Sequence, residues 1–481
     1  MNFADLLRNI EMVSCSANAE FEVADIQFDS RNTAAGSVFV ATRGTAVDGH
    51  DFIDKAIEMG ATAIVCESLP KNLQQHVCYV QVADTAQALG LLASAWYDFP
   101  SKKLKLIGIT GTNGKTTIAT LLYELFMQLG FKSGLLSTVC NYIAGKPIEA
   151  THTTPDALTL NKLLNEMVVT GCDYVFMEVS SHAVEQRRIA GLHFVGGVFT
   201  NITRDHIDYH LTFENYLKAK KRFFDELPST AFTLTNIDDK NGSVMLQNTS
   251  AKKYSYSQWG MADFKTKILE HGFDGMLLEI NHHEVHVPFI GKFNASNLTA
   301  VFGTAVLLGQ ADTEVLRIIS KLKSVSGRFE TLRAPQGYTA IVDYAHTPDA
   351  LKNVISSINQ ILEGNGHLIT VVGCGGNRDK GKRPMMAREA VDGSWKAILT
   401  SDNPRNEEPD EILNDMQAGL DPVQLAKSLR IVDRREAIKT ACALAQAGDV
   451  VLVAGKGHED YQIVKGIKHH FDDREEIRKC F

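Results

Sequence analysis

The stretch Gly111-Thr112-Asn113-Gly114-Lys115-Thr116-Thr117 decides the fold, because it joins a predicted strand to a predicted helix. An apolar run over 104–110 ends at this stretch, and apolar residues at helical spacing follow it over 118–129. A glycine-rich turn in such a place lets backbone N–H groups reach phosphate oxygens, and the helix N-terminus adds partial positive charge. We therefore expect a phosphate-binding loop, in which Lys115 reaches the terminal phosphates and Thr116 holds magnesium.

The loop is shorter than the full G-x-x-x-x-G-K-[ST] pattern, since Ile109 stands where that pattern has glycine. The alternative is an ordinary glycine turn that exposes Lys115 to solvent. We favour the phosphate loop because a strand pattern and a helix pattern adjoin the glycines directly.

The composition is that of a globular protein with several domains. The chain has 481 residues, a length that suggests about two to four domains, and 44% of the residues are hydrophobic. The net charge of −8 and the pI near 6.1 argue against a nucleic-acid-binding surface. No apolar run is long enough to span a membrane, and residues 1–10 lack the pattern of a signal peptide. We expect a cytoplasmic protein with no nucleic-acid or membrane partner.

Alternating apolar runs and helical patterns predict an α/β protein of three domains. Residues 1–101 form a small α/β domain, 102–332 a central P-loop domain with a mostly parallel sheet, and 333–481 a doubly wound, Rossmann-like domain. Between 252 and 286 the pattern changes to short alternating strands. The histidines there, His282, His283 and His286, fit an exposed hairpin better than a zinc site, since no carboxylate or thiol completes a ligand set.

Polar side chains follow the predicted strands of both larger domains. In the central domain, Glu178 to His182 follows one apolar run and Asn201 to His210 follows the next. Ligands collect at the carboxyl ends of parallel strands, so these groups can face the phosphate loop and coordinate magnesium. Similar clusters end the predicted strands of the last domain, at 342–346, 371–378, 400–405 and 451–459. The residues alone indicate ATP- and magnesium-dependent phosphoryl transfer to an acceptor that they do not define.

Four motifs in order closely resemble the Mur ligase family. They are 111–117, Met-Glu-Val-Ser-Ser-His at 177–182, Thr-Asn-Ile-Thr-Arg-Asp-His at 200–206 and Asp-Asn-Pro-Arg at 402–405. The resemblance runs from Asp29 to Gln462, and the short phosphate loop is the family's own form. It implies an amide ligase, with an N-terminal domain for a UDP-sugar, a central ATPase domain and a C-terminal domain for an amino acid. In the family mechanism ATP converts the substrate carboxylate to an acyl phosphate, which an amine then attacks.

The resemblance also assigns residues and partners. It implies ATP and Mg²⁺ as cofactors, UDP-N-acetylmuramoyl-L-alanyl-D-glutamate as a small-molecule substrate, and a monomer. The catalytic group is Lys115, Glu178, His206 and Lys220, and the metal ligands are Thr116, Glu178, His206 and Lys220, the last as a carbamate. The nucleotide contacts are Gly111, Thr112, Asn113, Gly114, Lys115, Thr116, Thr117, Asn294, Asn297, Arg328, Asp343 and His346. The contacts to the UDP-linked dipeptide are Ser30, Thr153, Thr154, Ser180, Gln186 and Arg188.

The amino acid implied by the C-terminal motif is meso-diaminopimelate. The implied contacts are Arg378, Asp402, Asn403, Arg405, Gly455 and Glu459. Diaminopimelate ends in both an amine and a carboxylate, so acidic and basic anchors both have a partner. Lysine lacks the distal carboxylate and would leave the arginines unpaired, at a cost of about 1 to 3 kcal/mol.

Three alternatives remain open at this point. A lysine-adding ligase shares the fold but should favour a different residue at 405. A folylpolyglutamate-synthase-like ligase shares the ATPase core, but we would not expect the Asp29-Ser30-Arg31 domain or the Asp-Asn-Pro-Arg motif in it. A nucleotide switch would be supported by a guanine-reading N-K-x-D element, which Asn236-Ile237-Asp238 does not supply.

Overall fold

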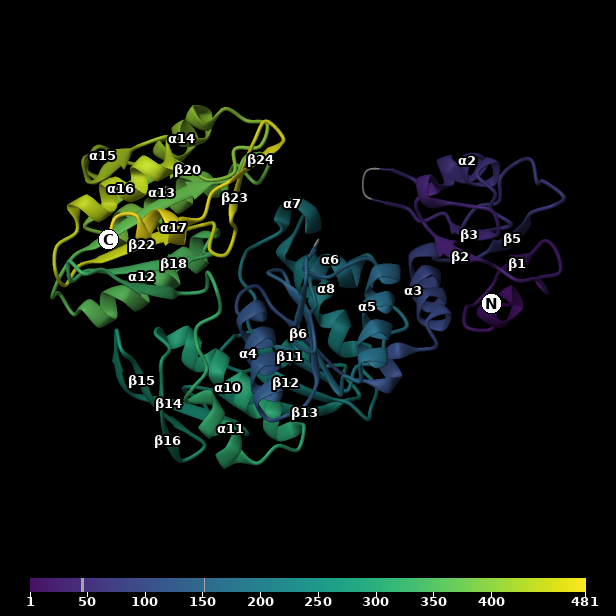
Figure 1. Cartoon of the computed structure of the whole chain (residues 1–481), viewed down its shortest axis with the longest axis horizontal. Coiled ribbons are helices and arrows are strands. Elements are labelled where there is room, and N and C mark those ends of the chain that lie inside the picture. Colours follow the sequence, from purple (N-terminus) through teal and green to yellow (C-terminus); the bar gives the residue numbers. More distant parts are fainter. Residues whose placement is uncertain (45–46, 151) are drawn as a thin grey trace.

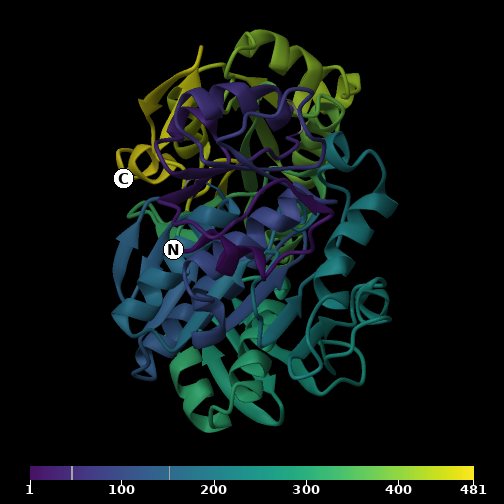
Figure 2. The same cartoon turned by 90° about the vertical axis from the view of Figure 1, so that its right-hand side faces the viewer.

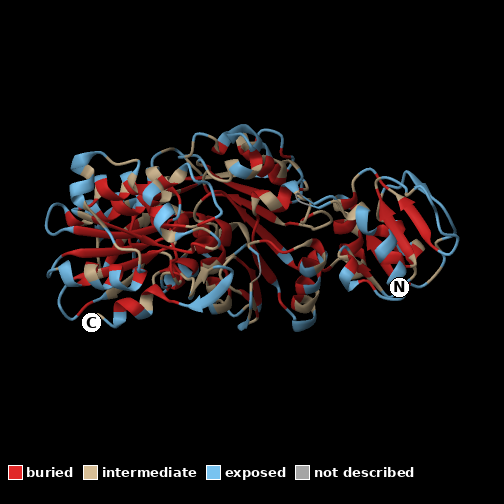
Figure 3. Cartoon of the chain, turned by 90° about the horizontal axis from the view of Figure 1, so that it is seen from above, coloured by how far each residue is buried: buried red, intermediate tan, exposed pale blue. Residues whose placement is uncertain are grey.

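The computed structural model describes residues 1–44, 47–150 and 152–481, and its N-terminal, central and C-terminal lobes lie in a row (Figure 1). Figure 2 looks along this row, with the N-terminal lobe in front of the other two. Most strands are buried in the interior of each lobe, whereas exposed residues gather on helices and loops (Figure 3). The predicted α/β class is confirmed. Within the described ranges, no helix is both long enough and apolar enough to be a membrane span.

The N-terminal lobe is a small sheet with the strand order β1-β5-β4-β3-β2, in which only the β1–β5 pair is antiparallel. Its strands are β1 (Ser14–Cys15), β2 (Asp25–Gln27), β3 (Ser37–Val40), β4 (Ala63–Cys66) and β5 (Cys78–Gln81). Its helices are α1 (Phe3–Leu7), α2 (Ile53–Glu58) and α3 (Thr85–Trp96), with short 3₁₀ turns at Ser30–Asn32 and Gly49–Phe52. The Asp84 side chain caps α3 by accepting from the Gln87 N–H at 2.9 Å. This helix joins the lobe to the central domain, where the Ser94 hydroxyl donates to the Gly191 carbonyl at 3.1 Å.

The central sheet has the order β16-β15-β14-β13-β12-β11-β6-β10-β7-β8-β9, and its strands from β14 to β7 pair in parallel. The strands are β6 (Lys105–Thr110), β7 (Ser133–Leu136), β8 (Asn141–Ile143), β9 (Lys146–Ile148), β10 (Tyr174–Glu178), β11 (Gly196–Phe199), β12 (Phe232–Asn236), β13 (Lys252–Ser257), β14 (Phe264–Gly272), β15 (Gly275–Ile280) and β16 (His283–Val287). The helices are α4 (Lys115–Gln128), α5 (Ala157–Thr170), α6 (Ser181–Glu185), α7 (Ile207–His210), α8 (Phe213–Asp225), α9 (Gly242–Met245), α10 (Lys292–Leu307) and α11 (Asp312–Ile319), after a 3₁₀ turn at Pro100–Lys103.

Helices cover both faces of the central sheet, because alternate residues of each strand point to opposite faces. On β10, Tyr174 and Phe176 join the core formed with α4 and α10, whereas Val175 and Met177 join the core formed with α5 and α8. The antiparallel β15–β16 pair is the predicted hairpin, and it exposes His282, His283 and His286. Both the helix after the phosphate loop and this hairpin are confirmed.

The C-terminal sheet has the order β17-β18-β22-β19-β20-β21, in which only β17 is antiparallel to its neighbour. Its strands are β17 (Glu330–Arg333), β18 (Thr339–Asp343), β19 (Leu368–Cys374), β20 (Lys396–Ser401), β21 (Ser428–Arg430) and β22 (Val450–Ala454), and a separate hairpin joins β23 (Tyr461–Val464) to β24 (Ile467–His470). Its helices are α12 (Pro348–Leu362), α13 (Lys382–Gly393), α14 (Pro409–Gln417), α15 (Pro422–Lys427), α16 (Arg434–Leu444) and α17 (Asp473–Arg478).

The C-terminal lobe is doubly wound, as predicted. The even-numbered β22 residues Val450 and Leu452 pack with α12 and α13, whereas Val451 and Val453 pack with α16 and α17 on the other face. The domain boundaries remain a prediction. At the second boundary, β17 (Glu330–Arg333) already pairs with β18, so the C-terminal sheet starts before residue 333.

A buried ion pair holds α17 against α16. Arg434 donates from Nε and Nη2 to the Asp473 carboxylate at 2.8 and 2.7 Å, and both side chains are fully buried. The second contact of Nη2, to the Ala454 carbonyl at 3.0 Å, ties the pair to the end of β22. This pair therefore couples the last helix to the strand that leads into the Gly455 loop.

Replacing Arg434 by methionine should lower the free energy of unfolding by about 3 to 5 kcal/mol, because Asp473 would stay buried without its partner. Urea denaturation followed by circular dichroism measures this change. Lys439→Met is the matched control, since Lys439 lies 3.9 Å from Glu436 in an exposed pair on the same helix. Its effect should stay below about 1 kcal/mol. Equal effects of the two substitutions would contradict the role of the buried pair.

Candidate active site

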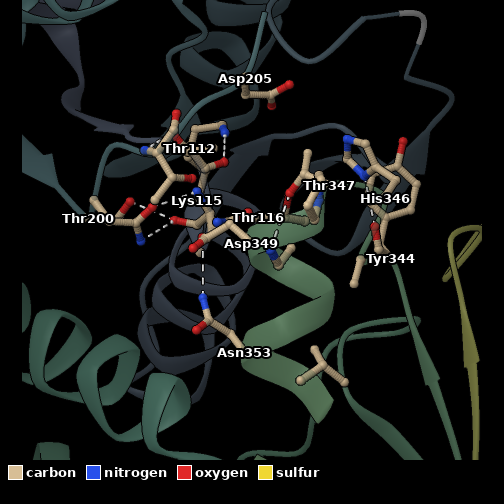
Figure 4. Close-up of a pocket in the computed structure, with 18 of the residues that line it drawn as sticks. Thr112, Lys115, Thr116, Thr200, Asp205, Tyr344, His346, Thr347, Asp349 and Asn353 are labelled. Atoms are coloured by element: carbon tan, nitrogen blue, oxygen red, sulfur yellow. Dashed lines mark hydrogen bonds between the residues drawn. The ribbon is translucent and has the colours of Figure 1, made fainter. Parts of the chain in front are cut away.

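A cavity of about 990 Å³ lies where the loops of the central and C-terminal domains meet. Figure 4 shows the phosphate-loop residues Thr112, Lys115 and Thr116 on one side of the cavity and Tyr344 and His346 on the other. The predicted site residues that line it are Thr112, Asn113, Gly114, Lys115, Thr116, Thr117, Thr153, Glu178, Ser180, His206, Lys220, Asn294, Asn297, Arg328, Asp343, His346, Arg378, Asp402, Asn403, Arg405, Gly455 and Glu459. The structure thus brings the predicted nucleotide, metal and amino-acid residues into one cavity.

Five predicted site residues do not line the cavity. Gly111, Thr154, Gln186 and Arg188 belong to the central domain outside the cavity lining, and Ser30 belongs to the N-terminal lobe. Within the motif at 151–155, Thr151 lies outside the described residues.

The phosphate loop is held from behind by the segment after β11. The Asn201 side chain accepts from the Asn113 N–H at 2.9 Å, and the Thr200 hydroxyl donates to the Asn113 carbonyl at 2.6 Å. Gly111 adopts a φ of 150°, and a Cβ there would lie 1.9 Å from the Thr200 hydroxyl. Only glycine lets the two strand ends approach this closely, so the loop's shape depends on β11 as well as on β6.

Helix α10 closes the other side of the loop. Gly114 has a φ of 86°, and a Cβ added there would lie 2.6 Å from the Asn297 side-chain oxygen. Asn297 in turn donates to the Asn294 oxygen at 3.2 Å, and Asn294 donates to the Ile290 carbonyl at 2.8 Å. The predicted nucleotide contacts on α10 are therefore joined to each other by buried amides, and Asn297 packs closely against Gly114 of the loop.

Two lysines converge on one backbone carbonyl. The Gly111 oxygen accepts from Lys115 Nζ at 2.9 Å and from Lys220 Nζ at 2.7 Å. Lys220 is only 1% exposed, and its burial together with the charge of Lys115 holds its pKa well below that of a free lysine. Loss of hydration also lowers the pKa of Lys115, although Glu178 and Asp205 oppose this change. A lowered pKa shifts Lys220 toward its neutral amine, and the neutral amine is the nucleophilic form of a lysine.

Glu178 supplies an unused buried acceptor. Its Oε1 accepts from the Thr138 N–H at 2.8 Å, whereas its Oε2 is buried without a hydrogen-bond partner among the described residues. A buried carboxylate oxygen that lacks a donor fits a cation, and oxygen is the ligand that magnesium prefers. The Glu178 carboxylate therefore fits the metal site that the sequence predicts.

His206 stands beside Asp205 at the edge of the cavity. Its backbone is in the left-handed region, with φ of 53°, and its N–H donates to the Asp205 side chain at 2.9 Å. Burial lowers the pKa of His206 to about 4, against the opposing charge of Asp205. The imidazole is therefore neutral near pH 7, which is the form that binds a metal.

Arg328 links the central phosphate loop to the C-terminal domain. Its Nη2 donates to the Thr116 hydroxyl at 3.1 Å, and its guanidinium lies 4.5 Å from the centre of the Tyr344 ring. Asp343 accepts from the N–H groups of Phe329 and Ala345, and its burial raises its pKa. Within the part of the chain that the structure describes, the Arg328 Nε is buried without a partner, so this guanidinium keeps a free donor at the junction of the two domains.

Thr154, Gln186 and Arg188 form a connected set with Ser180, which lines the cavity. Thr154 Oγ1 donates to the Glu178 carbonyl at 2.9 Å and accepts from the Ser180 N–H at 3.1 Å. Arg188 donates to the Thr154 carbonyl at 2.8 Å and, from Nη2, to the Gln186 side chain at 2.6 Å. These contacts fix the segment that carries Thr153 and Ser180 at the cavity wall.

The acidic residues of the last motif form a buried cluster. Asn403 donates to Glu459 at 2.8 Å, and Lys456 Nζ lies 3.1 Å from the same carboxylate. A Cβ on Gly455 would lie 2.7 Å from Asp402 Oδ2, so glycine is needed there. Burial, and then the charge of Asp402, raises the pKa of Glu459.

The basic residues lie on two loops, Arg378 after β19 and Arg405 after β20. Arg405 Nη1 donates to the Gly376 carbonyl at 2.9 Å, and a Cβ on Gly375 would lie 2.8 Å from that Nη1 and 3.7 Å from Arg378 Cγ. The two arginine side chains therefore flank one glycine, beside the acidic cluster. The cavity presents acidic and basic anchors side by side.

Several residues of this site were not assigned from the sequence. Thr200, Asn201 and Asp205 stand inside a quoted motif, and their position beside His206 was the available signal. Lys456 lies between two glycines of a predicted strand end. Nothing in the sequence indicates that the Tyr216 hydroxyl lies 3.0 Å from the Thr112 hydroxyl, because that contact joins residues 104 positions apart.

A phosphate loop at a strand-to-helix junction, facing a doubly wound domain across one cavity, defines a nucleotide-binding protein of the α/β class. Family models match most of the chain. The Mur ligase family catalytic domain matches residues 22–97, the Mur ligase middle domain 109–305, and the glutamate ligase domain of Mur ligases 327–457. The chain belongs to the Mur ligase family, as the four motifs predicted.

Similar proteins cover the full length of the chain. It is 61% identical over 481 residues to the UDP-N-acetylmuramoyl-L-alanyl-D-glutamate--2,6-diaminopimelate ligase of Parabacteroides distasonis, covering 100% of this chain and 99% of the relative. It is 60% identical, with the same coverage, to the protein of that name from Phocaeicola vulgatus. A solved structure with the same enzyme name has a TM-score of 0.71 and 33% identity, over 100% of this chain and 98% of the other.

Gly114→Ala should weaken ATP binding by about tenfold or more, because the added methyl group would displace Asn297 and distort the loop, and one lost hydrogen bond to a charged group costs about 1.5 to 3 kcal/mol. Titration calorimetry with ATP measures the change. Gly130→Ala is the control, since Gly130 has a similar φ of 93° with nothing within 4 Å of the added Cβ. A comparable loss of affinity in both variants would show that backbone strain, and not the contact with Asn297, is responsible.

Proposed function

We propose that this chain is an ATP-dependent ligase that joins meso-diaminopimelate to UDP-N-acetylmuramoyl-L-alanyl-D-glutamate in peptidoglycan synthesis. One observation carries the proposal: a single cavity holds the phosphate loop, the Glu178 and Lys220 cluster, and the acidic and basic anchors around Asp402 and Arg405. The full-length relatives that bear this enzyme name at about 60% identity support it. We further propose a cytoplasmic monomer, without a nucleic-acid or membrane partner.

The reaction needs a carboxylate to be activated, and the cavity offers the means. A carboxylate is a poor electrophile until one oxygen becomes a good leaving group. Transfer of the γ-phosphoryl group of ATP makes an acyl phosphate, whose carbonyl carbon the amine of the amino acid attacks, so that an amide bond forms and phosphate leaves. Lys115 and the backbone N–H groups of the loop stabilise the charge that develops on the transferred group.

Mg²⁺ is proposed as the cation of this site. Glu178 Oε2, the Thr116 hydroxyl, the neutral His206 ring and Lys220 as a carbamate would hold it. When bound, magnesium neutralises phosphate charge. The carbamate would form when the neutral Lys220 nitrogen attacks the carbon of CO₂ and releases a proton, which turns a cationic side chain into an anionic one. The lowered pKa of Lys220 favours the amine form that this step requires.

Selectivity for diaminopimelate is proposed to reside in the C-terminal anchors. Asp402 and Glu459 would accept from the distal ammonium, and Arg378 and Arg405 would donate to the distal carboxylate. With lysine the exposed Arg378 and the half-buried Arg405 would lose their charged partner, and the loss of these charge-assisted hydrogen bonds opposes binding.

Ser30 can contact the UDP-linked dipeptide only if the N-terminal lobe takes part in binding it. It lies on the 3₁₀ turn Ser30–Asn32, away from the cavity that Thr153 and Ser180 line. We propose that the N-terminal lobe holds the UDP end of the substrate, and that the lobes close during turnover.

Purified protein should form product with diaminopimelate and ATP faster than with L-lysine at equal concentration, because only diaminopimelate satisfies both sets of anchors. Phosphate release and chromatography of the UDP-linked product measure the two rates. Faster turnover of lysine would overturn the choice of amino acid. ATP-dependent turnover of neither would overturn the proposed ligase.

Lys220→Ala should lose at least about 100-fold in activity, more than is usual for an outer-shell partner of a metal. Added bicarbonate should not restore activity, whereas a short-chain carboxylic acid should restore part of it by supplying the missing anion. Lys218→Ala is the control, since Lys218 forms an exposed pair with Glu214 on the same helix. Full activity of Lys220→Ala would exclude the carbamate role.

A further inference from the structure

Arg383, near the start of α13, is a fully buried cation outside the site residues assigned above. Its Nη1 lies 2.9 Å from Glu407 Oε2 and 2.8 Å from Asp415 Oδ2. Its Nη2 donates to Glu407 Oε1 at 3.0 Å and to the Gly375 carbonyl at 3.4 Å. One guanidinium thus contacts α14, the loop after β19 and the loop after β20.

Glu407 connects Arg383 to the two loops that carry Arg378 and Arg405. It follows Arg405 by two residues, and its carboxylate accepts from the Asn377 N–H on the opposite loop. Hydrogen bonds from Arg383 lower the pKa of Glu407 to about 2, so this carboxylate is ionised across the neutral range. Arg383 and Glu407 together form a charged link between the segment at 375–378 and the segment at 402–407.

The two loops touch through their backbones. The Gly376 N–H donates to the Asn403 carbonyl at 2.9 Å, and a Cβ on Gly376 would lie 1.9 Å from the Pro404 carbonyl oxygen. Arg405 Nη1 donates back to the Gly376 carbonyl at 2.9 Å. The spacing of the Arg378 and Arg405 side chains therefore depends on how closely these loops are held together.

We propose that Arg383 is a positioning residue for amino-acid selectivity, which holds the loops of Arg378 and Arg405 at the spacing needed for both to bind one distal carboxylate. The inference rests on the proposed function, since it concerns the substrate of the same cavity. Arg383 itself does not line the cavity, so it acts through Glu407 and the loops. A planar guanidinium can bind two carboxylates and a carbonyl in one fixed geometry, whereas a lysine ammonium cannot.

The test compares Arg383→Lys and Arg383→Met with wild type in steady-state kinetics, with each of the three substrates varied in turn. For Arg383→Lys the KM for diaminopimelate should rise about 10- to 100-fold, since small displacements of a positioned group have effects of this size. The KM values for ATP and for the UDP-linked dipeptide should stay unchanged, and the preference for diaminopimelate over lysine should fall. Arg388→Met is the control, because Arg388 is exposed on the same helix and its side chain donates to the Gly419 carbonyl at 2.9 Å, away from Glu407.

Comparison of the two Arg383 variants, and a double variant with Arg405→Lys, separate positioning from stability. Arg383→Met removes the cation that Glu407 and Asp415 share and can unfold, whereas Arg383→Lys keeps the charge. Combined with Arg405→Lys, Arg383→Lys should add little to the rise in KM, because both act on the same contact. Unchanged selectivity in Arg383→Lys, or an equal rise of KM for all three substrates, would overturn the inference alone. A wild-type protein that makes no product would instead overturn the proposed function, and this inference with it.

Discussion

The hydrogen bonds of Lys115 and Lys220 to the Gly111 carbonyl are the contact on which the rest of the site depends. Burial lowers the pKa of both lysines, and the charge of Lys115 lowers that of Lys220 further, because two cations beside one carbonyl would repel each other. The arrangement needs Gly111 in a conformation that only glycine tolerates, which in turn brings the end of β11 against the loop. An anion near the loop would relieve the repulsion, so the site favours the binding of phosphate, or of a carbamate on Lys220.

The two larger domains divide the chemistry between them. The central domain supplies the phosphate loop, the free oxygen of Glu178 and the neutral imidazole of His206, which are groups suited to phosphoryl transfer. The C-terminal domain supplies acidic and basic side chains on adjacent loops, which are groups suited to a substrate with both charges. Arg328 connects the two, because one guanidinium contacts both Thr116 and the Tyr344 ring. The residues suited to phosphoryl transfer and those suited to binding the amino acid therefore lie far apart in the sequence but line one cavity.

The sequence predicted the fold well, because the signals that set it are local. The alternation of apolar runs and helical patterns predicted the parallel sheets, and the change of pattern after residue 252 predicted the β15–β16 hairpin. The placement of Glu178 and His206 could also be predicted, since both follow strands that end at one sheet edge. Contacts between residues far apart in the sequence could not be predicted. Examples are the hydrogen bonds of Asn201 to Asn113, of Tyr216 to Thr112 and of Arg383 to Glu407. They depend on side-chain packing, for which the sequence has no periodic signal.

The place of Ser30 on a separate lobe has a consequence for affinity. On the proposed function, the UDP end and the carboxylate end of one substrate bind to different lobes, so the substrate itself is the tether that joins them. Binding of the second end is then an intramolecular event, governed by an effective concentration that the length of the sugar-peptide sets. A shorter or longer sugar-peptide would change the affinity without altering any contact. The affinity for the substrate therefore depends on its length as well as on the groups at its two ends.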